Sequence, residues 1–240
     1  KVNQTFNILP ANRLADVSEY YFSKKLQEVA QMNAEGKDVI SLGIGSPDMP
    51  PSEDTIETLC HEAKNSNGHG YQPYTGIPEL RKSFAGWYKK WYHVELDSET
   101  EIQPLIGSKE GILHVTLAFV NPGEEVLVPN PGYPTYTSLS KILGAEVIHY
   151  NLKEENEWMP DFEELERMDL SKVKLMWTNY PNMPTGANAT PELYEKLVNF
   201  ARKHNIVIVN DNPYSFILNE HPLSILSIPG AKECCIELNS

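Results

Sequence analysis

A regular alternation of apolar and amphipathic segments between Ile102 and Leu238 places the strongest constraint on the fold of this chain. Short runs rich in Val and Ile alternate with longer stretches whose apolar residues recur at helical spacing. Several runs lack a polar face, which is typical of strands covered on both sides. The pattern therefore predicts an α/β fold, a mostly parallel sheet with helices on both faces. The predicted helices are 109–119, 135–143, 161–168 and 191–204, and the predicted strands are 125–129, 146–150, 173–178, 206–210 and 234–238.

The first hundred residues are less regular. Their predicted elements are helices 14–34, 53–65 and 78–92, a strand 39–42 and a turn-rich loop 43–51. Gly36 is expected to end the first helix. One stripe on the third helix is predicted to belong to the core: Leu80, Phe84, Trp87, Tyr88 and Trp91. We expect residues 1–50 to form an N-terminal arm and edge segment, and residues 51–240 to form a large ligand-binding domain that is incomplete at its C-terminus.

Composition excludes several classes of partner. The net charge of -13 repels nucleic-acid phosphates and anionic membranes, so neither is an expected partner. No window approaches the roughly 20 apolar residues of a membrane helix, and the N-terminus lacks the apolar core of a signal peptide. The three cysteines imply no disulfide framework. These features together predict a cytoplasmic protein.

Two polar motifs follow predicted strands near the end of the chain. Asp211 and Tyr214 come directly after strand 206–210, and the segment Pro181–Gly186 follows strand 173–178. The carboxyl ends of parallel strands form the edge where ligands bind, so these side chains are expected to face one ligand. A carboxylate and a phenol in that position suit a heteroaromatic cofactor. A turn-capping Asp and an ordinary packed Tyr are the alternatives.

Two further motifs fit the same edge. Ser108 and Lys109 open a helix directly after Gly107, so free backbone N–H groups and the positive helix end could bind an anion. A simple helix cap is the alternative interpretation. Tyr133 lies in a Pro-Gly turn after strand 125–129, where it faces the ligand edge or is buried as packing.

Together these motifs resemble those of class I, fold type I, pyridoxal-phosphate-dependent aminotransferases. The resemblance extends over nearly the whole chain and implies that pyridoxal 5'-phosphate is the cofactor. It assigns Asp211 to the ring nitrogen and Tyr214 to the phenolic oxygen. It assigns Ser108 and Lys109 to the phosphate, and Tyr133 to stacking on the ring.

The resemblance also assigns residues outside these motifs. Tyr71, in the segment Tyr71–Arg81, would reach the phosphate of a neighbouring subunit, which implies a homodimer with shared sites. Gly45 would line the pocket for the substrate carboxylate. Met183 stands where the family has an Asn that bonds the phenolic oxygen, and Asn182 lies one residue earlier. We expect the loop to shift so that Asn182 makes this contact, with Met183 covering the cofactor as the alternative.

The family's Schiff-base lysine would follow Ser240, as would most of the small domain. No catalytic residue is therefore predicted within the chain. Lys232 precedes the last predicted strand and should lie at the opposite edge of the sheet from Asp211. We expect these 240 residues alone not to transaminate.

The leading hypothesis is an aminotransferase that moves an amino group between an amino acid and a 2-oxo acid. A β-lyase or a cyclopropane-forming synthase would use nearly the same residues. A noncatalytic sensor domain of this fold is a third hypothesis. A nucleotide-binding Rossmann domain is disfavoured because Asp48 occupies the third glycine position of the fingerprint beginning at Gly43.

Overall fold

A computed structural model describes residues 8–15, 21–43, 45 and 48–240. The chain divides into two compact units, one of residues 1–15 and 75–240 and the other of residues 16–74.

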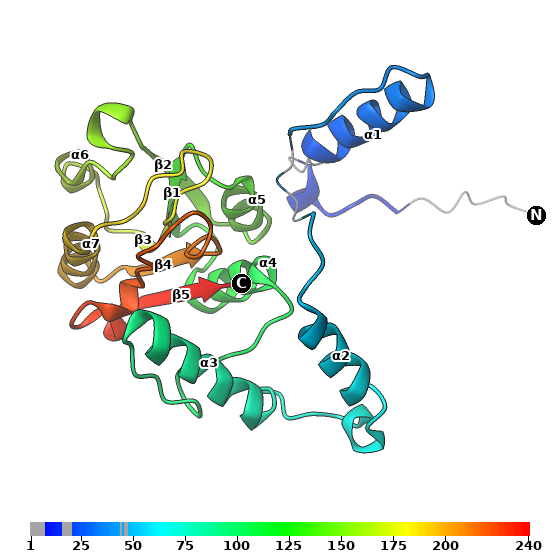
Figure 1. The fold of residues 1–240 in the computed structure, drawn as a ribbon. Coiled ribbons are helices and arrows are strands. Elements are labelled where there is room, and N and C mark those ends of the chain that lie inside the picture. Colours follow the sequence, from blue (N-terminus) through cyan, green and yellow to red (C-terminus); the bar gives the residue numbers. More distant parts are fainter. Residues whose placement is uncertain (1–7, 16–20, 44, 46–47) are drawn as a thin grey trace, which may run out of the picture. The chain divides into compact units, whose positions relative to one another are not determined.

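The larger unit is built on a five-stranded parallel sheet of order β2-β1-β3-β4-β5 (Figure 1). The strands are β1 Glu125–Asn130, β2 Glu146–Asn151, β3 Val173–Asn179, β4 Val207–Asn212 and β5 Cys235–Asn239. The predicted fold class is confirmed. One boundary matters for the site: β4 continues to Asn212, so Asp211 pairs within the sheet, opposite Asn179 and Leu238.

Helices cover both faces of this sheet (Figure 1). Helices α4 Ser108–Phe119 and α5 Pro134–Ile142 enclose one apolar cluster, and α6 Phe162–Glu166 and α7 Pro191–His204 enclose the other. Local signals set the bounds of α7, since the Thr190 side chain caps its first turn and Asn205 adopts a left-handed conformation after its last. Both faces are therefore buried, as the strands without a polar side predict.

The aromatic stripe predicted to be core is mostly at the surface. Helix α3, Pro78–Tyr92, buries Arg81, Tyr88 and Tyr92, whereas Trp87 and Trp91 are 43% and 39% exposed. Leu80 and Phe84 are exposed to a similar degree, so the prediction is correct only for Tyr88. Helical spacing finds an apolar stripe but does not say which of two apolar faces packs on the sheet.

The order of the strands reverses at β1. The chain moves from β1 to β2 on one side and then returns to place β3 on the other side of β1. The loops after β1 and β3 therefore diverge at their carboxyl ends, where open α/β sheets bind ligands. Because α4 leads into β1, its N-terminus reaches the same edge.

The smaller unit contains α1 Tyr21–Ala34, α2 Glu53–Glu62 and a short 3-10 helix Ser66–His69. Gly36 has a φ of 82°, as expected for a residue that ends α1. Residues 16–20 of the predicted helix 14–34 lie outside the described residues. The predicted strand 39–42 is wrong: within the described chain these residues pair with no strand, and Ile40 and Leu42 are 84% and 92% exposed. The short apolar run has no neighbouring strand to complete its hydrogen bonds.

Candidate functional site

Asp211 is a buried carboxylate whose two oxygens have different surroundings. The residue is 5% exposed. Its Oδ2 accepts a hydrogen bond of 2.7 Å from the Tyr136 hydroxyl, whereas its Oδ1 is buried without a hydrogen-bond partner among the described residues. Burial raises the pKa of Asp211 to about 6, and the Tyr136 hydrogen bond partly opposes this rise. A buried oxygen without a donor is costly, so Oδ1 is suited to accept from a ligand.

Tyr136 is held rigidly beneath this carboxylate. It lies in the first turn of α5 and is fully buried. Its ring stacks on Trp177 of β3, with centroids 5.0 Å apart and planes within 6°, and the Tyr133 ring meets it edge-on at 5.6 Å. The stack leaves the hydroxyl little freedom except to donate to Asp211.

Asn179 joins β3, β4 and the loop that follows β3. Its Nδ2 donates to the backbone oxygen of Asp211 at 2.8 Å, and its Oδ1 accepts from the Met183 backbone N–H at 2.8 Å. Its own carbonyl accepts from Asn182 Nδ2 at 3.2 Å. One buried amide thus fixes the loop relative to the carboxylate.

The loop after β3 carries the departure from the family pattern. The Asn182 Oδ1 accepts from the Thr185 hydroxyl at 2.8 Å, so much of its amide is used inside the loop. The Tyr214 hydroxyl lies 3.7 Å from Met183 Sδ and donates to it. Tyr214 and Met183 are therefore in contact, and the expected ligand contact of Asn182 stays a prediction.

The N-terminus of α4 supplies a candidate anion site. The Ser108 Oγ is buried and without a partner among the described residues. The Lys109 Nζ lies 6.0 Å from the centre of the Tyr133 ring. Tyr133 follows Gly132, where a Cβ would come within 2.5 Å of the Pro129 carbonyl oxygen, so only glycine allows this tight turn.

Five of the predicted site residues are thus linked by contacts that run through Tyr136 and Asn179: Lys109, Tyr133, Asn182, Asp211 and Tyr214. Ser108 is the neighbour of Lys109. Gly45 and Tyr71 belong to the smaller unit, where both are exposed, and their roles stay predictions. Tyr136 and Asn179 were not predicted as site residues. Each lies at or just after the carboxyl end of a strand, but its hydrogen-bond partner in Asp211 is distant in the sequence.

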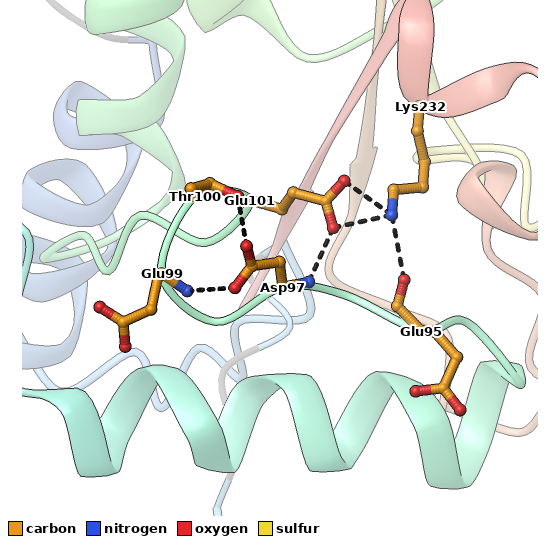
Figure 2. Close-up of polar contacts among 6 residues, drawn as sticks. All are labelled: Glu95, Asp97, Glu99, Thr100, Glu101 and Lys232. Carbon is orange, nitrogen blue, oxygen red and sulfur yellow. Dashed lines mark hydrogen bonds and ion pairs between the residues drawn. The ribbon is translucent and has the colours of Figure 1, made fainter.

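Lys232 lies away from this site, as expected. It precedes β5 and donates to Glu101 at 2.7 Å and to the Glu95 carbonyl at 3.1 Å (Figure 2). Figure 2 shows the loop folded around this contact, with Asp97 accepting from the Thr100 hydroxyl at 2.8 Å. Lys232 therefore stabilises an acidic loop at the amino end of the sheet.

The described residues include no group of His, Cys, Asp and Glu side chains able to hold a metal ion. None of the described helices is long and apolar enough to cross a membrane.

Residues 37–234 match the family model described as aminotransferase class I and II. The chain belongs to this aminotransferase family. The resemblance in the sequence motifs is thereby confirmed, and the sheet with its helices is the large domain of fold type I.

Two relatives of this aminotransferase chain are both named LL-diaminopimelate aminotransferase. The LL-diaminopimelate aminotransferase of Oleidesulfovibrio alaskensis is 45% identical over 233 residues, which cover 96% of this chain and 60% of that protein. The LL-diaminopimelate aminotransferase of Aquifex aeolicus is 43% identical over 232 residues, with the same coverage. The apo structure of BacF from Bacillus subtilis superposes with a TM-score of 0.92 at 38% identity, covering 98% of this chain and 60% of its own. The chain therefore spans about 60% of the length of the proteins it matches.

Proposed function

We propose that the whole protein is an aminotransferase that uses pyridoxal 5'-phosphate to move an amino group between an amino acid and a 2-oxo acid. The names of the relatives support this reaction class, and they make LL-diaminopimelate the first substrate to test. The observation that carries the proposal is the lone Oδ1 of Asp211.

The polar groups at the site fit this cofactor. Asp211 would accept from the ring nitrogen through Oδ1 and hold a proton there. The buried hydroxyl of Ser108, Lys109 and the N-terminus of α4 would bind the phosphate. Tyr133 would cover the ring, and Tyr214 would donate to the phenolic oxygen.

When bound, pyridoxal 5'-phosphate supplies an electron sink for charge that develops at the α-carbon of the substrate. Asp211 favours this chemistry because an anionic oxygen beside the ring nitrogen stabilises the protonated nitrogen. That oxygen is buried from water, which strengthens the interaction.

The remaining roles rest on the family resemblance and are part of this proposal. Tyr71 would reach the phosphate of a second subunit in a cytoplasmic homodimer, and its exposed phenol is available for such a contact. Gly45 would lie against the substrate carboxylate. Asn182 would use the remaining hydrogen of its Nδ2 toward the phenolic oxygen, because one Nδ2 donor bond is already made to Asn179.

Full-length protein incubated with cofactor, LL-diaminopimelate and a 2-oxo acid should form a new amino acid, measured by chromatography. Replacing Asp211 by Ala should abolish this turnover, because the ring nitrogen loses its acceptor. Near-normal turnover in Asp211→Ala would contradict the proposed role.

The same assay separates the alternatives. A β-lyase would consume an amino acid without needing the 2-oxo acid acceptor, and a sensor would bind cofactor without turnover of any amino acid. A product that depends on the acceptor supports the aminotransferase. Cofactor binding without any turnover across a panel of amino acids would favour the sensor.

A further inference from the structure

The hydroxyl of Tyr136 makes one hydrogen bond that divides the Asp211 carboxyl into two unequal oxygens. Oδ2 is used by the phenol at 2.7 Å, and Oδ1 is left buried without a partner among the described residues. The backbone oxygen of Asp211 is fixed separately by Asn179 at 2.8 Å. Asp211 is therefore held at two points, its backbone oxygen and Oδ2, and Oδ1 remains for a ligand.

The phenol donates to the ionised carboxyl. Burial, followed by the nearby Asp211 charge, raises the pKa of Tyr136 far above its ordinary value. Tyr136 therefore stays protonated around neutral pH, where it can donate to the carboxyl. A phenol that always donates favours the ionised form of its carboxyl partner over the protonated form.

Few charged groups act on this pair. Among the described titratable side chains, Tyr136 is the one that shifts the pKa of the Asp211 carboxyl. Its hydrogen bond lowers this pKa, whereas burial raises it. Tyr136 itself faces Tyr133 and Tyr150 as well as Asp211. The Lys109 Nζ lies 6.0 Å from the Tyr133 ring centre. The Tyr136 hydrogen bond is thus the main local influence that opposes protonation of Asp211.

We propose that Tyr136 is a positioning residue that holds Asp211 by Oδ2 and so reserves Oδ1 for the ring nitrogen of the cofactor. This inference rests on the proposed function, because it requires pyridoxal 5'-phosphate at the site. It assigns a role to a hydroxyl that ring packing alone does not need, since phenylalanine would stack on Trp177 equally well.

The test compares Tyr136→Phe with Tyr150→Phe in the full-length protein. Tyr150 is a matched control because it is also a buried phenol, and its hydroxyl donates to the Trp177 backbone oxygen at the same distance of 2.7 Å. Both variants lose one buried hydroxyl, but only the first loses a bond to Asp211.

The first measurement is the titration of the Asp211 carboxyl in cofactor-free protein, followed by its infrared C=O stretch and identified by its loss in Asp211→Asn. The wild-type midpoint is expected at about 6. Tyr136→Phe should raise it by about one to two pH units, the usual effect of one hydrogen bond to a charged group. Tyr150→Phe should leave it unchanged, because a purely structural defect does not favour one protonation state of Asp211.

The second measurement is the dissociation constant of pyridoxal 5'-phosphate at pH 7, from fluorescence titration. Tyr136→Phe should weaken binding at least about tenfold relative to Tyr150→Phe. Equal midpoints and equal dissociation constants in the two variants would overturn the role of Tyr136 while leaving the proposed function intact. A wild-type protein that titrates at Asp211 but does not bind the cofactor would overturn the proposed function, and this inference with it.

A Tyr136→Phe protein that fails to fold is replaced by protein carrying 3-fluorotyrosine at position 136. Fluorine makes the phenol a stronger donor with little change in shape, so the Asp211 midpoint should fall instead of rise. An unchanged midpoint in that protein would overturn the inference.

Discussion

Replacing Asp211 by Asn should stabilise the cofactor-free protein at alkaline pH. The carboxyl group is 5% exposed, and burial raises its pKa to about 6 from an ordinary 3.8. The folded chain therefore binds a proton more tightly than the unfolded chain between these values. The stability that Asp211 contributes is fully present below about pH 3.8 and is lost as the pH rises through about 6.

The magnitude follows from the same two values. At about 1.4 kcal/mol for each pKa unit, ionising Asp211 in the fold costs about 3 kcal/mol at pH 8. The neutral amide avoids this cost but leaves its Nδ2 where Oδ1 lacked a partner, so the net gain in unfolding free energy should be about 2 kcal/mol. At pH 5 the gain should be smaller by about 1.4 kcal/mol, because most of the wild-type carboxyl in the fold is then protonated.

Urea unfolding of the full-length apo protein, followed by circular dichroism at pH 5 and pH 8, measures this difference. The control is Asp169→Asn, because Asp169 is exposed and hydrogen bonds from Ser171 lower its pKa. Asp169→Asn should lose a little stability or none at pH 8, whereas Asp211→Asn should gain stability. Asp211→Asn that is less stable than wild type at pH 8 would refute the argument that an unpaired buried charge is being removed.

Two further predictions concern Asn179 at the carboxyl end of the strands and Lys232 at their amino end. Asn179→Ala should lower the unfolding free energy by about 3 kcal/mol in urea, because the Asp211 carbonyl and a loop N–H lose their buried partner. Asn130→Ala, at the exposed end of β1, should change it by less than about 0.5 kcal/mol, and equal losses would contradict the argument. Lys232→Ala should cost about 0.5 to 1 kcal/mol, since its partner Glu101 is partly solvated. Hydrogen bonding to Lys232 lowers the pKa of Glu101, so this loss should disappear as the pH falls through the acid range, and a loss that persists at low pH would contradict it.

The sheet could be predicted because its signals are local. Apolar runs such as 125–129 and 173–178 cannot face water on either side, and each of the predicted strands in the larger unit exists with shifts of one or two residues at its ends. Strand 39–42 failed for the opposite reason, because a run of four residues with three apolar side chains does not determine whether a pairing partner lies beside it.

Residues of the candidate site could be predicted from the sequence, but the hydrogen bonds between them could not. Asp211, Tyr133 and Tyr214 were predicted from their places at or near the carboxyl ends of strands. The bond from Tyr136 to Asp211 joins residues 75 positions apart, and the reach of Asn179 across β4 depends on strand register. Neither is encoded in local spacing. The exposed side of α3 could not be predicted either, because Trp87 and Trp91 have the same spacing as core residues.

The stack of Trp177 on Tyr136 also gives the molecule its own optical probe. Trp177 is fully buried, whereas Trp87 and Trp91 are partly open to solvent. Its emission should therefore lie toward shorter wavelengths and resist quenching by dissolved acrylamide. Since only one phenol ring separates this indole from the Asp211 carboxyl, ligand binding there can be followed by the indole emission without attaching a dye.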